Sequence, residues 1–259
     1  MSTPTAVRVW ESQFAVYRRV WLSNILGSFV QPLMFLLGMG VGVGALIDDG
    51  PGEAALGGVP YFAFLGPALM ATTAMLTGGQ SSLWETLDQF MYGAQYKAMV
   101  ATPLSPADVA AGAALWHATR VGIGSGGVAI VLACFDETRT LALVPAVAAA
   151  ILTGLAFALP ITAYTSTRED DHSFIAVIRL GFIPMFLFSG AFFPIEELPS
   201  WLQPIAKVTP LWNGIELCRG LVLGTLDAAA AVVHVTYLSV LALGGWLACR
   251  VLFARRLLP

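Results

Sequence analysis

Long uncharged apolar runs recur along the whole chain of 259 residues and are separated by short charged loops. A helix rises about 1.5 Å per residue, so about 20 apolar residues cross a hydrocarbon core of about 30 Å. The strict alternation typical of membrane β-strands is not found. The pattern therefore predicts an all-α integral membrane protein with six transmembrane helices, at residues 24–47, 59–77, 107–134, 141–165, 174–193 and 228–253.

Three further segments have patterns of their own. Residues 6–22 repeat apolar side chains at steps of three and four, with arginines on the opposite face, which predicts an amphipathic helix in the membrane interface. Residues 82–96 place Trp84, Leu87 and Met91 on one face and predict a short cytoplasmic helix. Residues 195–222 are apolar but interrupted by prolines, which favours a re-entrant pair of short helices in the outer leaflet.

The distribution of charge predicts the orientation in the membrane. Hydrophobic residues make up 57% of the chain and charged residues 11%, with a mean hydropathy of +0.77. With a cytoplasmic amino terminus, nine basic residues lie inside: Arg8, Arg18, Arg19, Lys97, Arg168, Arg179, Arg250, Arg255 and Arg256. Only Arg139, Lys207 and Arg219 then lie outside. Because basic loops stay on the cytoplasmic side, we expect a multi-pass protein of the inner (plasma) membrane with both termini cytoplasmic.

Motifs for catalysis or cofactor binding are weak. Gly122, Gly124 and Gly127 match GxGxxG but lie inside an expected span and follow no strand. The sequence contains no GxxxxGK[ST] motif, and its three cysteines are scattered. The acidic loop at 168–173 is more typical of a helix cap than of a metal site. We therefore expect no catalytic residue, no metal and no cofactor bound by this chain.

Two alternatives stay open. Ser125 or Ser189 with His234 would suit an intramembrane protease, although neither serine has glycine two positions before it. Arg120 and His117 lie one turn apart inside residues 107–134, where ionisable side chains are functional candidates. Arg120 has a role in coupling or substrate passage, or it reaches back to the inner surface. An ion- or proton-coupled transporter or channel would need more such groups than these.

Several segments together resemble the ABC-2 type permeases of ABC exporters. The most specific is Phe188-Ser189-Gly190-Ala191-Phe192-Phe193-Pro194, followed by Leu198-Pro199, Pro210-Leu211 and residues 215–219. Residues 23–27, 32–44, 61–65, 71–75, 97–104 and 252–257 also fit, so the resemblance covers nearly the whole chain. The sequence is most similar to the branch of NodJ-type lipooligosaccharide exporter permeases and daunorubicin-resistance permeases.

The resemblance implies a half-transporter that exports an amphipathic lipid-linked, glycolipid or drug-like substrate out of the cytoplasm or the inner leaflet. Two permease subunits, identical or paralogous, would line the path. Two cytoplasmic ATPase subunits would bind ATP and Mg and drive transport, and no nucleic acid is expected. The helix at 82–96 resembles the family's coupling helix, so we expect it to contact the ATPase through Trp84, Glu85, Asp88, Gln89, Phe90 and Tyr92.

The resemblance also suggests residues for the other two regions. In the re-entrant segment the candidates are Trp201, Trp212, Glu216 and Arg219. Glu216 and Arg219 match the family's acidic and basic positions, and a local ion pair is the simpler interpretation. Candidates for the substrate path are Phe35, Met39, Arg120, Phe182, Phe186 and Phe188, although core packing accounts for the apolar ones equally well.

Overall fold

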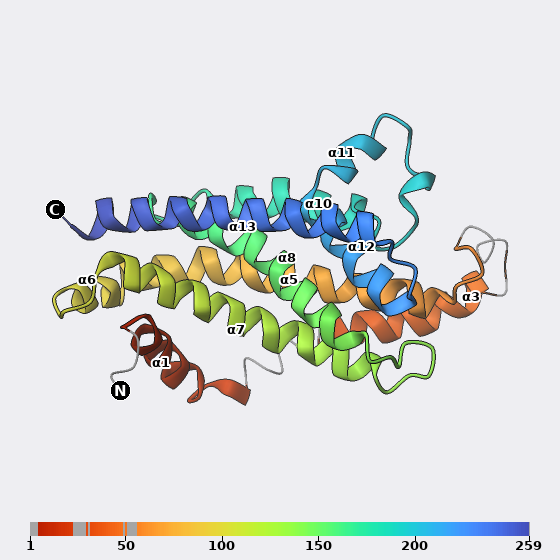
Figure 1. Ribbon diagram of the computed structural model, residues 1–259, viewed down its shortest axis with the longest axis horizontal. Coiled ribbons are helices and arrows are strands. Elements are labelled where there is room, and N and C mark those ends of the chain that lie inside the picture. Colours follow the sequence, from red (N-terminus) through yellow and green to blue (C-terminus); the bar gives the residue numbers. More distant parts are fainter. Residues whose placement is uncertain (1–4, 23–29, 31, 49, 51–55, 259) are drawn as a thin grey trace.

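The computed structural model describes residues 5–22, 30, 32–48, 50 and 56–258, and every regular element in these residues is a helix. The predicted all-α fold is therefore confirmed. The helices run along one long axis (Figure 1). Helices α1 (Thr5–Tyr17) and α6 (Gln95–Val100) and the last turns of α13 (Ala228–Leu257) lie at one end, which we call the α6 end. Helix α3 (Gly44–Asp48) lies at the other, the α3 end.

The core is built around α5 (Tyr61–Phe90), which packs against α7 (Pro106–Leu132) and α8 (Leu143–Thr165). Glycines let these helices approach closely. A Cβ added at Gly78 would lie 2.7 Å from the Gly154 carbonyl oxygen, and one added at Gly154 would lie 2.6 Å from Val121 Cγ1. Small residues at such crossings are typical of membrane helices, where close van der Waals contact drives association.

Among the described residues, three helices are long and apolar enough to cross a membrane: α5, α8 and α13. Pro32–Asp48 and Phe174–Phe188 are shorter apolar helices. Helix α7 has 27 residues, but Asp108, His117 and Arg120 lower its hydropathy. The count of six spans therefore stays a prediction, and residues 24–29 and 31 of the first expected span lie outside the described residues.

The expected separate helix at 82–96 is wrong. Helix α5 continues without a break from Tyr61 to Phe90, which at about 1.5 Å per residue is about 45 Å. Hydropathy falls after residue 77 and Gly78 and Gly79 follow, but α5 continues through both glycines. The chain turns only at residues 91–94, where Ala94 adopts a positive φ of 46°, and α6 follows.

The expected fifth span, at 174–193, also ends early. It consists of α9 (Phe174–Ala176), a π-helical turn η2 (Val177–Phe182) and α10 (Ile183–Phe188). Gly190 has a φ of 75°, a left-handed conformation that suits glycine and ends the helix. A second π-helical segment, η1 (Leu36–Val43), precedes α3.

The predicted re-entrant segment contains a 3₁₀ turn η3 (Ile195–Glu197) and two helices, α11 (Gln203–Lys207) and α12 (Pro210–Leu223). Helix α11 projects from the bundle, whereas α12 packs into it (Figure 1). Thr209 caps α12 by accepting a hydrogen bond from the Trp212 backbone, and Pro210 occupies its first turn. Gly214 of α12 lies against Thr153 of α8 so closely that an added Cβ would meet the threonine Cγ2 at 2.4 Å.

Candidate functional site

Helix α1 is docked on protein. It lies beside α7 at the α6 end (Figure 1). Val9 covers Gly112, where an added Cβ would lie 2.4 Å from the valine Cβ. Trp10 Nε1 donates a hydrogen bond of 2.9 Å to Thr119 Oγ1. The predicted amphipathic helix ends at Tyr17, short of residue 22, and one of its faces is committed to α7.

Arg120 pairs with Glu85, and this pair joins α7 to α5. The Arg120 Nη2 atom lies 3.2 Å from Glu85 Oε1, and Trp116 Nε1 donates to Glu85 Oε2 at 3.0 Å. The Arg120 guanidinium also lies 5.2 Å from the centre of the Tyr17 ring of α1. Glu85 is about 36 Å along α5 from Tyr61, farther than a hydrocarbon core of about 30 Å. The pairing therefore favours a place for Arg120 near the membrane surface rather than at mid-membrane.

His117 ties three helices together. Its Nδ1 lies 3.1 Å from Ser81 Oγ of α5, and its Nε2 lies 3.1 Å from Thr162 Oγ1 of α8. The side chain is buried, and both ring nitrogens have hydroxyl partners. Ser81 and Thr162 could not be recognised as partners from the sequence, because only the helix packing brings them together with His117.

The residues considered for proteolysis lie apart from one another. Ser125 Oγ donates to the Met70 carbonyl oxygen, and Ser189 Oγ lies 3.1 Å from Thr209 Oγ1. His234 Nδ1 bonds to Asn213 Oδ1 at 2.8 Å. Neither serine has His234 as a partner, which argues against the protease alternative. Among the residues that the structure describes, no group of three potential metal ligands is found either.

The six residues expected at the ATPase contact differ in how far the structure exposes them. Trp84, Asp88 and Tyr92 are exposed, with Tyr92 at 79%, and Glu85 and Gln89 are half-buried. Phe90 is only 1% exposed, so its expected surface role is wrong. It packs edge-on against Tyr96 at 4.9 Å and against Phe253 at 4.9 Å between ring centroids.

Residues 91–94 and α6 form a corner that is anchored to several helices; we call it the α5–α6 corner. Tyr96 is buried, which raises the pKa of its hydroxyl, and Gln13 Nε2 of α1 donates to that oxygen at 3.4 Å. Arg256, near the end of α13, donates to the Ser166 carbonyl oxygen at 2.8 Å and lies 4.2 Å from the centre of the Phe90 ring. Burial lowers the pKa of Arg256. From the sequence, Arg256 was only an inner positive charge.

The candidates for the substrate path are only partly brought together. Phe35 of the Pro32–Asp48 helix lies 6.1 Å from Phe186 of α10 between ring centroids. Phe182 is buried in the core, so it does not line a path in this arrangement. Met39 is half-buried against the same core, and Phe188 is exposed. Arg120 lies away from them, with Glu85.

Arg219 links the re-entrant segment to α5 and to the turn that follows α10. Its Nη2 donates to the Gly190 carbonyl oxygen at 2.8 Å and its Nε to the Phe64 carbonyl oxygen at 3.1 Å. Its Nη1 pairs with Glu216 at 3.1 Å, as the spacing predicted. The guanidinium lies 3.7 Å from the centre of the Phe64 ring. The sequence did not reveal the two carbonyl partners, which give Arg219 a structural role.

The two expected tryptophans of this segment differ. Trp212 packs edge-on against His234, with 5.2 Å between ring centroids. Trp201 is exposed.

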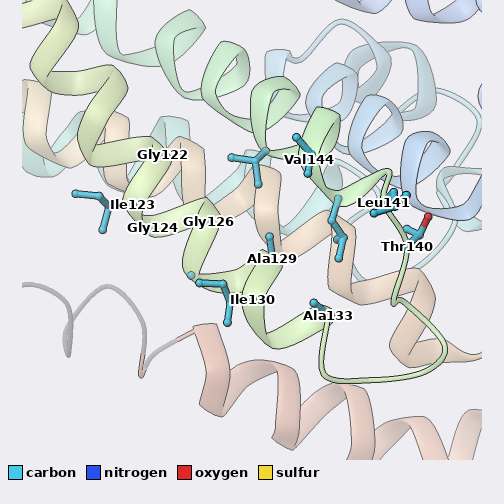
Figure 2. Close-up of a pocket in the computed structure, with 13 residues that line it drawn as sticks. Gly122, Ile123, Gly124, Gly126, Ala129, Ile130, Ala133, Thr140, Leu141 and Val144 are labelled. Carbon is cyan, nitrogen blue, oxygen red and sulfur yellow. The ribbon is translucent and has the colours of Figure 1, made fainter.

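Two cavities differ in character. Figure 2 shows an apolar groove of about 710 Å³ along α7 and α8, toward the α3 end. Its floor includes Gly126, where an added Cβ would meet nothing within 4 Å, and among the described residues that line it only Thr140 has a polar side chain. The second cavity, of about 350 Å³, lies between α1, α5 and α7 at the α6 end and contains Glu85, Asp88 and Arg120. Of these two cavities, the one at the α6 end therefore has the polar lining.

Comparison with known proteins identifies the family. The family model described as ABC-2 type transporter matches residues 6–223. Nodulation protein J of Rhizobium meliloti (strain 1021) is 29% identical over 253 residues, which cover 98% of this chain and 94% of that protein. Nodulation protein J of Rhizobium leguminosarum bv. viciae is 31% identical over 250 residues, 96% of this chain and 94% of its own length. The chain therefore belongs to the ABC-2 type transporter family of integral membrane proteins.

Proposed function

We propose that this chain is the permease subunit of an ABC exporter, which moves an amphipathic lipid-linked, glycolipid or drug-like molecule out of the cytoplasm or the inner leaflet. The observation that carries the proposal is the family match over residues 6–223, together with similarity to nodulation protein J along nearly the whole chain. The excess of basic residues on one side supports an inner-membrane protein with both termini cytoplasmic. The α6 end is then the cytoplasmic end.

The energy for export comes, in this proposal, from two separate ATPase subunits that bind ATP and Mg. A second permease subunit, identical or paralogous, completes the transporter. The α5–α6 corner is the best candidate for the ATPase contact, because Tyr92 is 79% exposed there and Lys97 is also exposed. Interface energy is concentrated in a few aromatic and charged anchors.

The packing of the corner supports a mechanical role. Tyr96 is buried between Phe90 and Phe253, and Arg256 bonds to the end of α8. A displacement of the corner by an ATPase would therefore act on α13 and α8 directly. Trp84 and Glu85 are less suited to the contact, since Trp84 packs on Phe174 and Glu85 is engaged by Arg120.

Copurification with the ATPase encoded by the neighbouring gene tests the proposal. We expect Tyr92→Ala to weaken copurification and to reduce substrate-stimulated ATP hydrolysis, while the isolated permease unfolds at an unchanged temperature. Trp201→Ala is the matched control, because Trp201 is also an exposed aromatic residue, at 68%, and lies far from the corner. Failure of any ATPase to associate with the wild-type chain would refute the function. Normal assembly of Tyr92→Ala would refute only the contact.

A further inference from the structure

The cavity at the α6 end has the lining of a binding site. It measures about 350 Å³, within the range of ligand pockets, and lies between α1, α5 and α7. Four large aromatic side chains line it: Tyr17 of α1, Trp84 of α5, Trp116 of α7 and Tyr96 of α6. Gln13, Val16 and Tyr17 of α1, the helix that lies beside α7 in Figure 1, form one side of the cavity.

Unsatisfied hydrogen-bonding atoms are concentrated in the same place. Among the described residues, five buried side-chain oxygens lack a hydrogen-bond partner. Three of them, Gln13 Oε1, Thr86 Oγ1 and Gln89 Oε1, belong to residues that line this cavity. Gln13 is 6% exposed and Thr86 is 1% exposed. Buried polar groups in native proteins nearly always have partners, so such a cluster is suited to a ligand with hydrogen-bonding groups.

The charges limit the chemistry of that ligand. The Glu85 carboxylate is engaged by Arg120 and Trp116, and Asp88 adds a second negative charge at the exposed side. The amide oxygens of Gln13 and Gln89 accept hydrogen bonds, and the Thr86 hydroxyl either accepts or donates. The Arg120 guanidinium also lines the cavity, but it is paired with Glu85, so an anionic group such as a phosphate would meet mostly acceptors and the Asp88 carboxylate. A ligand rich in hydroxyl groups would satisfy every one of these atoms.

We propose that this cavity binds the polyhydroxylated headgroup of an amphipathic molecule, with its hydroxyls on Gln13, Thr86 and Gln89. The aromatic side chains Tyr17 and Trp84 cover the less polar face of the headgroup. Val16 of α1 and Val20, which follows α1, line the cavity and are exposed, so they offer an apolar surface to an attached acyl chain. The placement of this cavity on the cytoplasmic side of the membrane rests on the proposed function, whereas the binding of the headgroup does not.

The test uses the full-length chain alone, in phosphatidylcholine nanodiscs, with tritiated octyl glucoside as the probe. We expect saturable binding of octyl glucoside and none of octyl phosphate, which has the same chain and an anionic headgroup. Monooctanoylglycerol distinguishes the sources of the headgroup. If monooctanoylglycerol competes as well as unlabelled octyl glucoside, the site recognises the glycerol of a bilayer lipid. If it does not compete, the site recognises a sugar ring. Absence of saturable glucoside binding, or equal binding of octyl phosphate, would overturn the proposal.

A pair of variants separates binding from folding. Thr86→Val keeps the shape of the side chain and removes one unpaired hydroxyl, so we expect about tenfold weaker glucoside binding with thermal stability unchanged or raised. Ser82→Ala is the matched control, because Ser82 Oγ is also buried and unpaired in α5 but does not line the cavity. Its binding should equal that of the wild type. Wild-type affinity in Thr86→Val would contradict the assignment, and normal ATPase assembly in that case would leave the proposed function standing.

Discussion

Replacing Arg219 with leucine should destabilise the protein strongly, even though the residue sits in a segment rich in turns. The substitution removes the donors to the carbonyl oxygens of Gly190 and Phe64 and leaves both without this partner. It also removes the partner of Glu216. Gly190 ends α10 and Phe64 lies in α5, so the link between these elements and α12 would be lost.

The magnitude follows from which of these bonds is buried. The Arg219 side chain is 10% exposed and the Glu216 side chain is 38% exposed, so solvent screens the ion pair. The two bonds to carbonyls are made by a buried charged donor, and such bonds contribute about 1.5–3 kcal/mol each. We therefore expect Arg219→Leu to lower the free energy of unfolding by about 3–5 kcal/mol. Glu216→Gln should lower it by under about 1 kcal/mol.

The chain offers a matched control in Arg139. Arg139 and Asp136 also form a pair at i,i+3, with a shorter distance of 2.7 Å, but their side chains are 67% and 86% exposed. Arg139→Leu should therefore change the free energy of unfolding by under about 0.5 kcal/mol. The shorter ion pair is expected to matter less, because burial rather than distance decides the effect.

Chemical unfolding of the purified permease in detergent measures all three variants, with tryptophan fluorescence as the signal. The expected order of destabilisation is Arg219→Leu, then Glu216→Gln, then Arg139→Leu. Equal effects of Arg219→Leu and Glu216→Gln would show that the ion pair dominates. That result would refute the role assigned to the two carbonyl bonds.

Three further predictions address packing, orientation and the Arg120 pair. Gly245→Ala should destabilise by about 1–3 kcal/mol, since its Cβ would lie 2.5 Å from Pro160 Cδ, whereas Gly244→Ala, with nothing within 4 Å, should be neutral or stabilising in the same unfolding assay. With Cys134 replaced by alanine, a cysteine at the exposed Glu137 should react with an impermeant maleimide in intact cells and one at Asp170 only after permeabilisation; the reverse pattern would invert the orientation. Gly52, which suits the same experiment, lies outside the described residues, and Thr138 is buried. Arg120→Leu should insert normally but impair export, because Glu85 loses its ion-pair partner and is left with the hydrogen bond from Trp116. Unchanged transport at equal expression would show that Arg120 only extends toward the membrane surface.

The sequence predicted the helices well where hydropathy and helix boundaries coincide. Helix α7 begins at Pro106 after the Ser105 cap, and α13 begins after the Asp227 cap, both near the expected positions. The boundary of α5 was missed, because a drop in hydropathy ends a membrane segment but does not end a helix. The chain needs a conformational break for that, and it occurs at residues 91–94.

The candidate site was harder to predict, because its contacts join residues far apart in sequence. Arg120 was singled out by its place in an apolar segment, but Glu85 was assigned to a surface that it only partly faces. Gln13 and Tyr96 meet at 3.4 Å across 83 positions, and no periodicity signals that contact. Phe90 was expected at the surface because it shares a helix with exposed residues, and the aromatic contact with Phe253 of α13 buries it.

The helical segments of the molecule differ in how regular they are. Helices α5 and α13 are continuous α-helices of 30 residues each, anchored at the α6 end by Tyr96 and Arg256. Toward the α3 end α13 is held to α12 through His234 and Asn213. The segments η1 and η2 instead contain π-helical turns, which are rare in proteins and occur frequently at functional sites. The segments that contain them meet where Phe35 lies 6.1 Å from Phe186 between ring centroids, so both departures from the regular α-helix belong to one packed region.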